Sequence, residues 1–134
     1  MSKRLKNFMR YWFPVLIYCL LIIIQSSRPS PECLPHLPYM DKFLHFAGYG
    51  LLGALFLRAY KTLSMRNRTG LLVTISILSA FIFGITDEIH QYYVPRRSSD
   101  LMDLMADLLG SAFGVFLYQL IHANRYHHAA GVSE

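Results

Sequence analysis

Three aspartates lie in a stretch whose other residues are mostly apolar, at Asp100, Asp103 and Asp107 in SSDLMDLMADLLGSAFG. The stretch has the composition of a helix that enters a lipid bilayer, and residues three and four apart share one face of a helix. A carboxylate at the centre of a bilayer costs at least about 2.5–3.5 kcal/mol on insertion scales. Acids in such a place can bind a cation, transfer protons or recognise a polar ligand, and we interpret them as a candidate functional site.

Two other apolar segments carry similar polar groups near one end. These polar residues are Asp41, Lys42, His45, Asp87, Glu88 and Gln91. If the three segments are consecutive membrane helices, all of these side chains converge on the same leaflet. The polar faces continue inward as small residues at Gly84, Gly110 and Gly114, which let helix backbones approach closely. We therefore expect helix packing at these glycines and acids that face the bundle interior.

Some of the acids also have a structural explanation. Asp100 fits the N-cap of a helix better than a ligand role, because helix N-termini stabilise anions. Asp41 also stands at the start of its segment, so both roles stay open for it. Glu88 lies near a helix C-terminus, where the helix dipole disfavours an anion, and Asp103 and Asp107 lie deeper in their helix. For these last three acids the pattern favours function.

Basic side chains nearby leave a second interpretation open. Lys42, Arg96 and Arg97 could neutralise the acids and form a salt-bridge network that only fixes helix packing. Buried ion pairs are poor sources of net stability, so scaffolding alone is a weak explanation. His45 is either a satisfied interior histidine or an imidazole oriented by Asp41, four residues earlier, and this spacing favours the second.

The whole chain has the composition of a small integral membrane protein. Its 134 residues suffice for one domain, and 54% of them are hydrophobic. Four apolar runs are long enough to cross a bilayer, at residues 8–25, 41–60, 71–92 and 101–122. We expect an all-α, polytopic membrane protein with four transmembrane helices in a compact bundle, a single domain over residues 1–134, and a disordered cytoplasmic tail over 123–134. The first run could also be a signal peptide, although it lacks a convincing cleavage site.

The distribution of lysine and arginine predicts the orientation. Basic residues precede the first run, surround the loop between the second and third runs, and follow the fourth, whereas the other loops hold fewer of them. The positive-inside rule then places both termini in the cytoplasm and the polar cluster on the extracytoplasmic side. The net charge of +5 follows from this topology and from contact with the bilayer surface, so it does not call for nucleic acid as a partner.

Two long stretches resemble a known family. DKFLHFAGYGLLG, from Asp41 to Gly53, and GITDEIHQYYVPRRSSDLMDLMADLLGSAFG, from Gly84 to Gly114, are similar to the VanZ-like family of small bacterial membrane proteins. The shared pattern is D-K-x-x-H, then E-x-x-Q, an aromatic, P-x-R, an acid six residues later and a helix rich in small residues. The resemblance covers nearly the whole chain.

The resemblance implies a set of site residues in this sequence. They are Asp41, Lys42, His45, Glu88, Gln91, Arg97, Asp103, Asp107 and Gly110. At Asp107 the family pattern often has asparagine, which puts in doubt any role there that needs a neutral amide. The resemblance also implies a bacterial cytoplasmic membrane, and a link to low-level resistance to the glycopeptide teicoplanin through the founding member. It implies the fold more firmly than the chemistry.

The first hypothesis for function is an enzyme-like site in the outer leaflet that acts on a lipid-linked precursor, a glycolipid or another cell-envelope substrate. Glu88, Asp103 and Asp107 would bind a divalent cation or divide the general acid and base roles, with His45 transferring protons. Oxygen ligands would suit Mg²⁺ or Mn²⁺, whereas His45 with two acids could hold Zn²⁺.

The remaining polar residues would bind the substrate in this hypothesis. Lys42 and Arg97 would receive a phosphate, and Asp41 and Gln91 would complete the pocket. The alternative is a non-catalytic envelope protein whose polar cluster binds a lipid headgroup, an antibiotic or a partner protein. Ion translocation is less attractive, because the expected cytoplasmic halves of the polar faces carry no acid.

Overall fold

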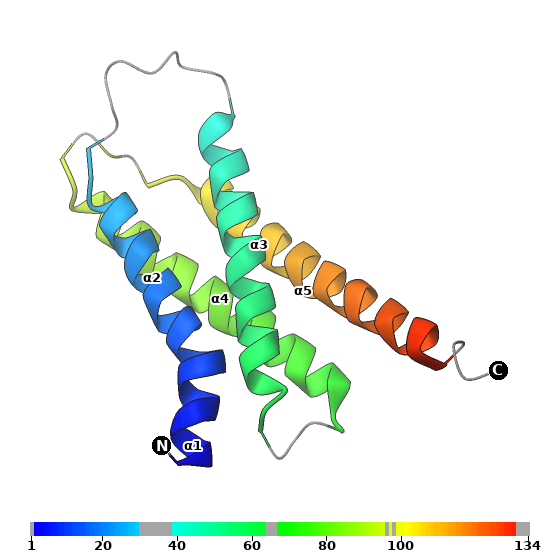
Figure 1. Cartoon of the computed structure of the whole chain (residues 1–134). Helices are drawn as coiled ribbons and strands as arrows, with labels where there is room; N and C mark the ends of the chain where they lie inside the picture. Colours follow the sequence, from blue (N-terminus) through cyan, green and yellow to red (C-terminus); the bar gives the residue numbers. More distant parts are fainter. Residues whose placement is uncertain (1, 30–38, 64–66, 96, 98, 131–134) are drawn as a thin grey trace.

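The chain folds into helices in the part that the structure describes. The structure is a computed structural model that describes residues 2–29, 39–63, 67–95, 97 and 99–130. Its elements are α1 (Lys3–Asn7), the π-helical segment η1 (Phe8–Trp12), α2 (Phe13–Ser26), α3 (Met40–Tyr60), α4 (Thr69–Tyr92) and α5 (Leu101–Ala130). Because α1, η1 and α2 follow one another without a break, four long helices result (Figure 1). The all-α class is therefore confirmed for the described residues.

The first and last helices are longer than the apolar runs alone predicted. The first helix begins at Lys3, not at residue 8, and the Ser2 hydroxyl accepts a hydrogen bond from the Leu5 amide at its start. Helix α5 continues to Ala130, whereas the sequence predicted a helix that ends at residue 122 and a disordered tail after it. Residues 123–130 contain no glycine or proline, so nothing in this stretch ends the helix. Residues 131–134 of the predicted tail lie outside the described residues.

The polar residues gather at one end of the bundle. There α3 begins, α4 ends and α5 begins, whereas α1, the end of α3 and the start of α4 lie at the opposite end (Figure 1). Helix α4 ends three residues before Pro95, as the restriction on residues before a proline predicts. Asp100 caps α5, since its Oδ1 accepts a hydrogen bond from the Met102 amide at 2.9 Å.

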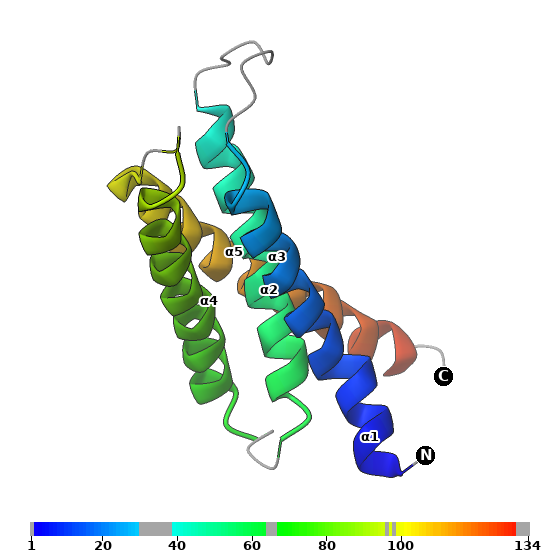
Figure 2. The same ribbon diagram turned by 90° about the vertical axis from the view of Figure 1, so that its left-hand side faces the viewer.

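Glycines set how closely α3 and α5 approach. Both views of the ribbon show α5 crossing α3 at an angle (Figures 1 and 2). At Gly110 an added Cβ would meet the backbone of Phe46, and at Gly114 it would meet the backbone of Gly50. At Gly84 it would meet the carboxylate of Asp107. The glycines expected to serve helix packing therefore lie at close helix contacts, where any larger residue would push the backbones or the site apart.

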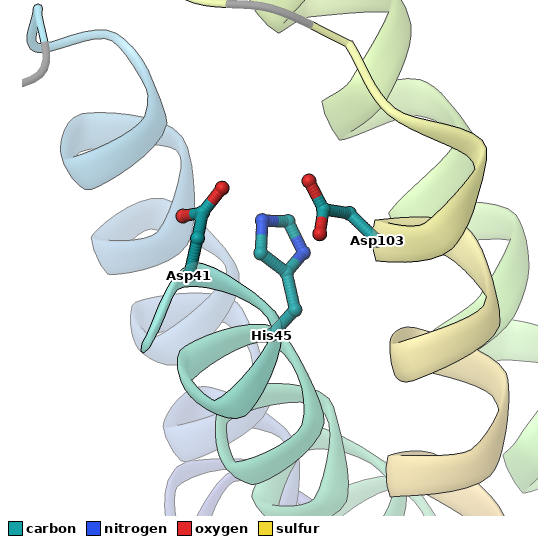
Figure 3. Close-up of side chains that lie close together, drawn as sticks. All are labelled: Asp41, His45 and Asp103. Atoms are coloured by element: carbon teal, nitrogen blue, oxygen red, sulfur yellow. The ribbon is translucent and has the colours of Figure 1, made fainter. Parts of the chain in front are cut away.

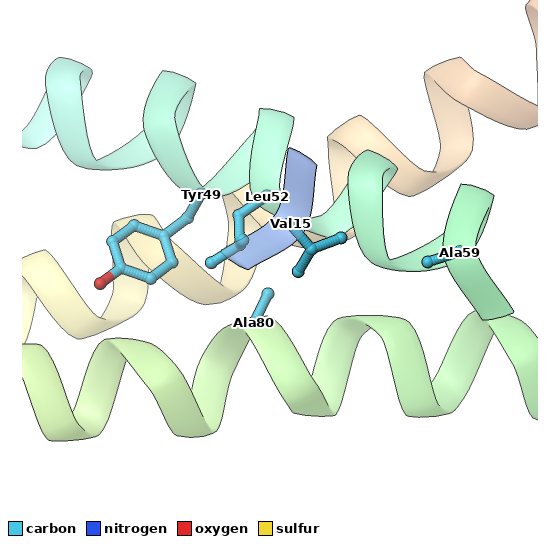
Figure 4. Close-up of a cluster of buried hydrophobic side chains, with 5 residues drawn as sticks. All are labelled: Val15, Tyr49, Leu52, Ala59 and Ala80. Carbon is cyan, nitrogen blue, oxygen red and sulfur yellow. The ribbon is translucent and has the colours of Figure 1, made fainter. Parts of the chain in front are cut away.

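A small apolar core lies below the polar end. Val15, Tyr49, Leu52, Ala59 and Ala80 are buried against one another and join α2, α3 and α4 (Figure 4). A second cluster of Leu57, Leu72 and Val115 joins α3 and α4 to α5. These contacts hold the helices in register and so fix the position of the polar side chains above them.

The outer surface has the character of a membrane protein. Large apolar side chains such as Leu16, Ile82 and Phe116 are exposed on the outside of the bundle, where their contact with water would be unfavourable. Three segments have the length and composition of membrane spans, Lys3–Ser26, Thr69–Tyr92 and Leu101–Ala123. The expected fourth span, α3, does not meet the same criterion, because charged residues, glycines and tyrosines lower its hydropathy. The membrane-type fold is confirmed, whereas a fourth span is not.

Candidate functional site

His45 of α3 lies at the centre of the polar end. Its Nδ1 is 2.9 Å from Oδ1 of Asp107 on α5, and its Nε2 is 3.9 Å from Oε1 of Glu88 on α4. All three side chains are buried, with exposed fractions of 8% for His45, 3% for Glu88 and 0% for Asp107. Each comes from a different helix, so the bundle brings together three residues that are far apart in the sequence. With Asp107 ionised, Nδ1 carries the proton of a neutral imidazole and Nε2 is left as the basic nitrogen.

Lys42 connects the start of α3 to the start of α5. Its ammonium donates to Oδ2 of Asp100 at 2.7 Å and to Oδ1 of Asp103 at 3.1 Å. Asp103 is almost fully buried, whereas the side chain of Asp100 is partly exposed. Hydrogen bonding to Lys42 holds the pKa of Asp100 below its ordinary value. Lys42 is thus already committed to two carboxylates, which differs from the phosphate-binding role expected for it.

A second polar group lies beside His45. Asp87 on α4 accepts hydrogen bonds on Oδ2 from the Tyr49 hydroxyl at 3.3 Å and from the Gln91 amide at 3.0 Å. The ring of Tyr49 stacks on the imidazole of His45, with centroids 6.0 Å apart and planes 5° apart. Asp87, Tyr49 and Gln91 are all buried. This group therefore supports one side of the imidazole while Asp107 holds its edge.

Three buried carboxylate oxygens have no hydrogen-bond partner among the described residues. They are Oδ1 of Asp87, Oε1 of Glu88 and Oδ2 of Asp107. The other oxygen of Glu88 accepts a hydrogen bond from the Asp100 amide at 3.1 Å. Buried polar atoms are nearly always satisfied in folded proteins, and a fully paired scaffold network would leave none of these oxygens free. Chemically, such an arrangement can take up a proton, a cation or a polar ligand.

Asp41 stands at the rim of this centre. Figure 3 shows the imidazole of His45 between the carboxylates of Asp41 on α3 and Asp103 on α5. One ligand atom from each of these residues lies within 4.8 Å of the others. Asp41 is exposed, and the hydrogen bond that orients the imidazole is accepted by Asp107. The carboxylate that fixes His45 is therefore on another helix, not one turn away as its spacing suggested.

A cavity of about 740 Å³ reaches His45 from the side of α2. Its polar lining includes Gln25, Arg28, Asp41, His45, Asp87, Gln91 and Arg97, and its apolar lining includes Leu21, Ile22, Ile24, Leu44 and Leu51. Leu21 and Ile24 of α2 and Leu44 and Leu51 of α3 are exposed on the outer surface. The cavity thus joins the buried polar centre to the apolar exterior between these two helices.

Arg97 ties the connection between α4 and α5 to the end of α2. Its Nε donates to the carbonyl oxygen of Arg28 and one terminal nitrogen donates to that of Gln25, both at 3.1 Å. Arg97 also lines the cavity. A role in positioning α2 thus accompanies the phosphate-binding role expected for Arg97.

The comparison with known families agrees with the pattern read from the sequence. A family model described as VanZ/LLP1 matches residues 3–122. The chain belongs to the VanZ-like family. An uncharacterized protein of Schizosaccharomyces pombe is 31% identical to it over 109 residues, which cover 81% of this chain and 64% of the relative. The chain thus spans a little under two thirds of that relative's length, and no solved structure matches it significantly.

Two residues of this VanZ-like site were missing from the set that the resemblance implied. Asp87 shares the polar face of Glu88 and Gln91 but has no place in the family pattern, and Tyr49 follows His45 by one helical turn. Tyrosine is common at membrane–water interfaces, yet Tyr49 is buried in the bundle. The i, i+4 spacing to His45 is the signal that could have identified it.

Tyr49→Phe tests the support of the VanZ-like site. The change removes the hydroxyl that donates to buried Asp87 and retains the ring that stacks on His45. We expect a loss of about 1–2 kcal/mol of unfolding free energy, because Asp87 would keep only its bond from Gln91. Thermal unfolding in detergent measures the effect. Tyr92→Phe is the control, since Tyr92 is largely exposed; equal melting temperatures for the two variants would contradict the prediction.

Proposed function

We propose that this VanZ-like protein acts within the membrane on a lipid-linked substrate whose polar headgroup reaches His45. The observation that carries the proposal is the cavity between α2 and α3, because its lining offers both surfaces that an amphiphile requires. His45, Asp87 and Gln91 lie at its polar end. Leu21 and Leu44 lie on its apolar walls and are exposed to the exterior. A lipid could then enter sideways between the helices while its chain stays in the bilayer.

The headgroup in this proposal is anionic. Arg28 and Arg97 both line the cavity. Their guanidinium groups suit a phosphate, which they can bind through paired hydrogen bonds. The carbonyl contacts of Arg97 use its Nε and one terminal nitrogen, so donors on the guanidinium are left for a ligand.

The proposed reaction is hydrolysis of an ester or phosphoester bond in the headgroup. His45, oriented by Asp107, accepts a proton from water through Nε2 while the water oxygen bonds to the phosphorus or acyl carbon. The bond from that atom to the leaving oxygen breaks, and the leaving oxygen takes up the proton. Water is the only co-reactant, and the products are an alcohol and an acid. Glu88, which faces Nε2, is placed to pass the proton on.

The membrane placement belongs to the same proposal. We place α3 in the bilayer as a fourth crossing, with both termini in the cytoplasm and the His45 end on the extracytoplasmic side of a bacterial cytoplasmic membrane. The support is the distribution of lysine and arginine along the chain. The substrate is then an envelope lipid precursor or a glycolipid. A role in glycopeptide resistance rests on the resemblance to the founding member.

The experiment measures lipid turnover in proteoliposomes that contain a bacterial total lipid extract, analysed by untargeted mass spectrometry. We expect wild type to convert one lipid class and Glu88→Gln to be at least about 100-fold slower, as for the loss of a general acid–base group. Tyr92→Phe, at an exposed aromatic residue, should retain the wild-type rate. If wild type retains a lipid through purification but converts none, the protein is a binding protein and the proposed hydrolysis is wrong.

A second pair of variants tests the cavity itself. An added Cβ at Gly48 would meet only the Tyr18 hydroxyl at an ordinary distance of 3.7 Å, so Gly48→Ala should be tolerated. Gly48→Leu places a larger side chain in the same cavity wall. We expect it to lose copurified lipid and turnover while it melts close to Gly48→Ala. Undiminished turnover in Gly48→Leu would exclude this cavity as the substrate path.

A further inference from the structure

We propose that His45, Glu88 and Asp107 form a binding site for one first-row divalent metal ion of the Zn²⁺ or Mn²⁺ class. Each residue offers one ligand atom, and the three atoms lie within 4.8 Å of one another. The three residues come from α3, α4 and α5, so a bound ion would join three helices at the polar end.

Carboxylate oxygens without a hydrogen-bond partner are evidence for a bound ligand, in addition to the cluster of acids. Oε1 of Glu88 and Oδ2 of Asp107 are buried without a hydrogen-bond partner among the described residues. Oε1 of Glu88 faces the imidazole across 3.9 Å. Two carboxylates this close to one imidazole repel each other unless a positive charge, carried either by the protonated imidazole or by a bound cation, lies between them. The nearby cation, Lys42, is held by Asp100 and Asp103, so it does not supply that charge.

The donor set selects the class of metal. One imidazole nitrogen with two carboxylate oxygens suits Zn²⁺, Mn²⁺ or Fe²⁺, whereas Mg²⁺ and Ca²⁺ favour oxygen ligands alone. Three protein ligands also leave a position for water, as in catalytic zinc sites. Donor atoms around a tetrahedral Zn²⁺ lie roughly 3.3 Å apart, given bonds of about 2.0–2.1 Å. Binding therefore draws the three side chains together and should stabilise the bundle.

A second set of possible ligands, Asp41, His45 and Asp103, is less suitable. Asp41 is exposed, and Asp103 already accepts a hydrogen bond from Lys42 at 3.1 Å. In the chosen set, Glu88 and Asp107 each have an oxygen without such a bond. With the ion bound, His45 would be a ligand instead of the base, and the ion would take over the activation of the attacking water in the proposed hydrolysis.

The test uses the 134-residue protein in detergent after treatment with chelator, with Zn²⁺, Mn²⁺ or Mg²⁺ added separately. Bound metal is measured by elemental mass spectrometry, and stability by the melting temperature. We expect one Zn²⁺ per chain and a rise of several degrees in the melting temperature with Zn²⁺ or Mn²⁺. A response to Mg²⁺ alone, or to none of the three ions, overturns the proposal.

Matched variants identify the ligands. Glu88→Gln and Asp107→Asn should bind Zn²⁺ more than about tenfold more weakly, whereas Asp41→Asn keeps all three proposed ligands and should bind like wild type. All proteins carry His127→Ala and His128→Ala, so that the two adjacent histidines near the C-terminus do not contribute. Equal Zn²⁺ affinity in Glu88→Gln, or loss of binding in Asp41→Asn, contradicts the assignment. Should Glu88→Gln fail to fold, Glu88→Asp must show the weaker binding instead.

The same preparations separate this inference from the proposed hydrolysis. Zn²⁺ binding is read without any lipid, and lipid turnover is read with and without chelator. Lipid turnover that persists in chelator supports the proposed hydrolysis and contradicts a metal site in it. Stoichiometric Zn²⁺ binding without a change in any lipid supports the metal site and contradicts the hydrolysis.

Discussion

A Gly114→Ala variant is expected to lose about 3 kcal/mol of unfolding free energy, the upper end of the range for overpacked sites. The added Cβ would overlap the carbonyl group and the Cα of Gly50 on α3. Backbone atoms cannot rotate away as a flexible side chain can, so α3 and α5 must separate. These two helices share the most extensive contact in the bundle and carry His45 and Asp107, so the change also widens the site.

Unfolding in detergent by heat or by increasing sodium dodecyl sulfate measures this loss. Gly70→Ala is the matched control, because nothing lies within 4 Å of an added Cβ there. Alanine at that position of α4 should be neutral or stabilising by up to about 1 kcal/mol. If both alanine variants unfold alike, close contact between α3 and α5 does not determine the stability of this fold.

The second large effect is expected for Lys42→Met, with a loss of about 2–3 kcal/mol. Breaking a fully buried ion pair costs about 3–5 kcal/mol, and the partial exposure of Lys42 reduces that figure. The loss arises because the Asp103 carboxylate, only 1% exposed, would be left without its cation. Asp100 is partly exposed and keeps its capping bond to Met102, so it should contribute little.

A double variant separates lost charge compensation from lost packing. Lys42→Met with Asp103→Leu removes both charges and replaces them with apolar groups, which is often close to neutral for a buried pair. We expect the double variant to regain most of the stability that Lys42→Met loses, measured by the same unfolding curves. If the double variant loses as much unfolding free energy as the two single variants together, the contribution of the pair comes from packing and not from charge compensation.

The resemblance and the helical periodicity predicted much of the site. They selected His45, Glu88, Asp103 and Asp107, and the structure places all four in the buried part of one end of the bundle. The reason is geometric. Three consecutive helices alternate in direction, so the start of α3, the end of α4 and the start of α5 must lie at the same end of the bundle. The predicted cap at Asp100 has a similarly local cause.

The partners within the site depended on how the helices rotate about their own axes. Spacing alone predicted that Asp41 orients His45, whereas Asp107 does so across 62 residues of sequence. For Lys42 the sequence left two interpretations open, a phosphate ligand or a partner of the acids, and in the structure Lys42 contacts Asp100 and Asp103. A helical face predicts which side chains point inward, but it cannot predict which residue of a facing helix each one meets.

The sequence by itself determined the family, the helical class, the membrane character and the end of the bundle where the acids gather. Those properties depend on composition, on local periodicity and on charge distribution, which are all readable along one chain. Only the tertiary structure decided that Tyr49 donates a hydrogen bond to Asp87 in the site, and that three carboxylate oxygens have no partner among the described residues. It also decided that a cavity joins His45 to the exterior beside α2. These features arise from the contacts of four helices at once, which the glycine contacts of α5 fix in space.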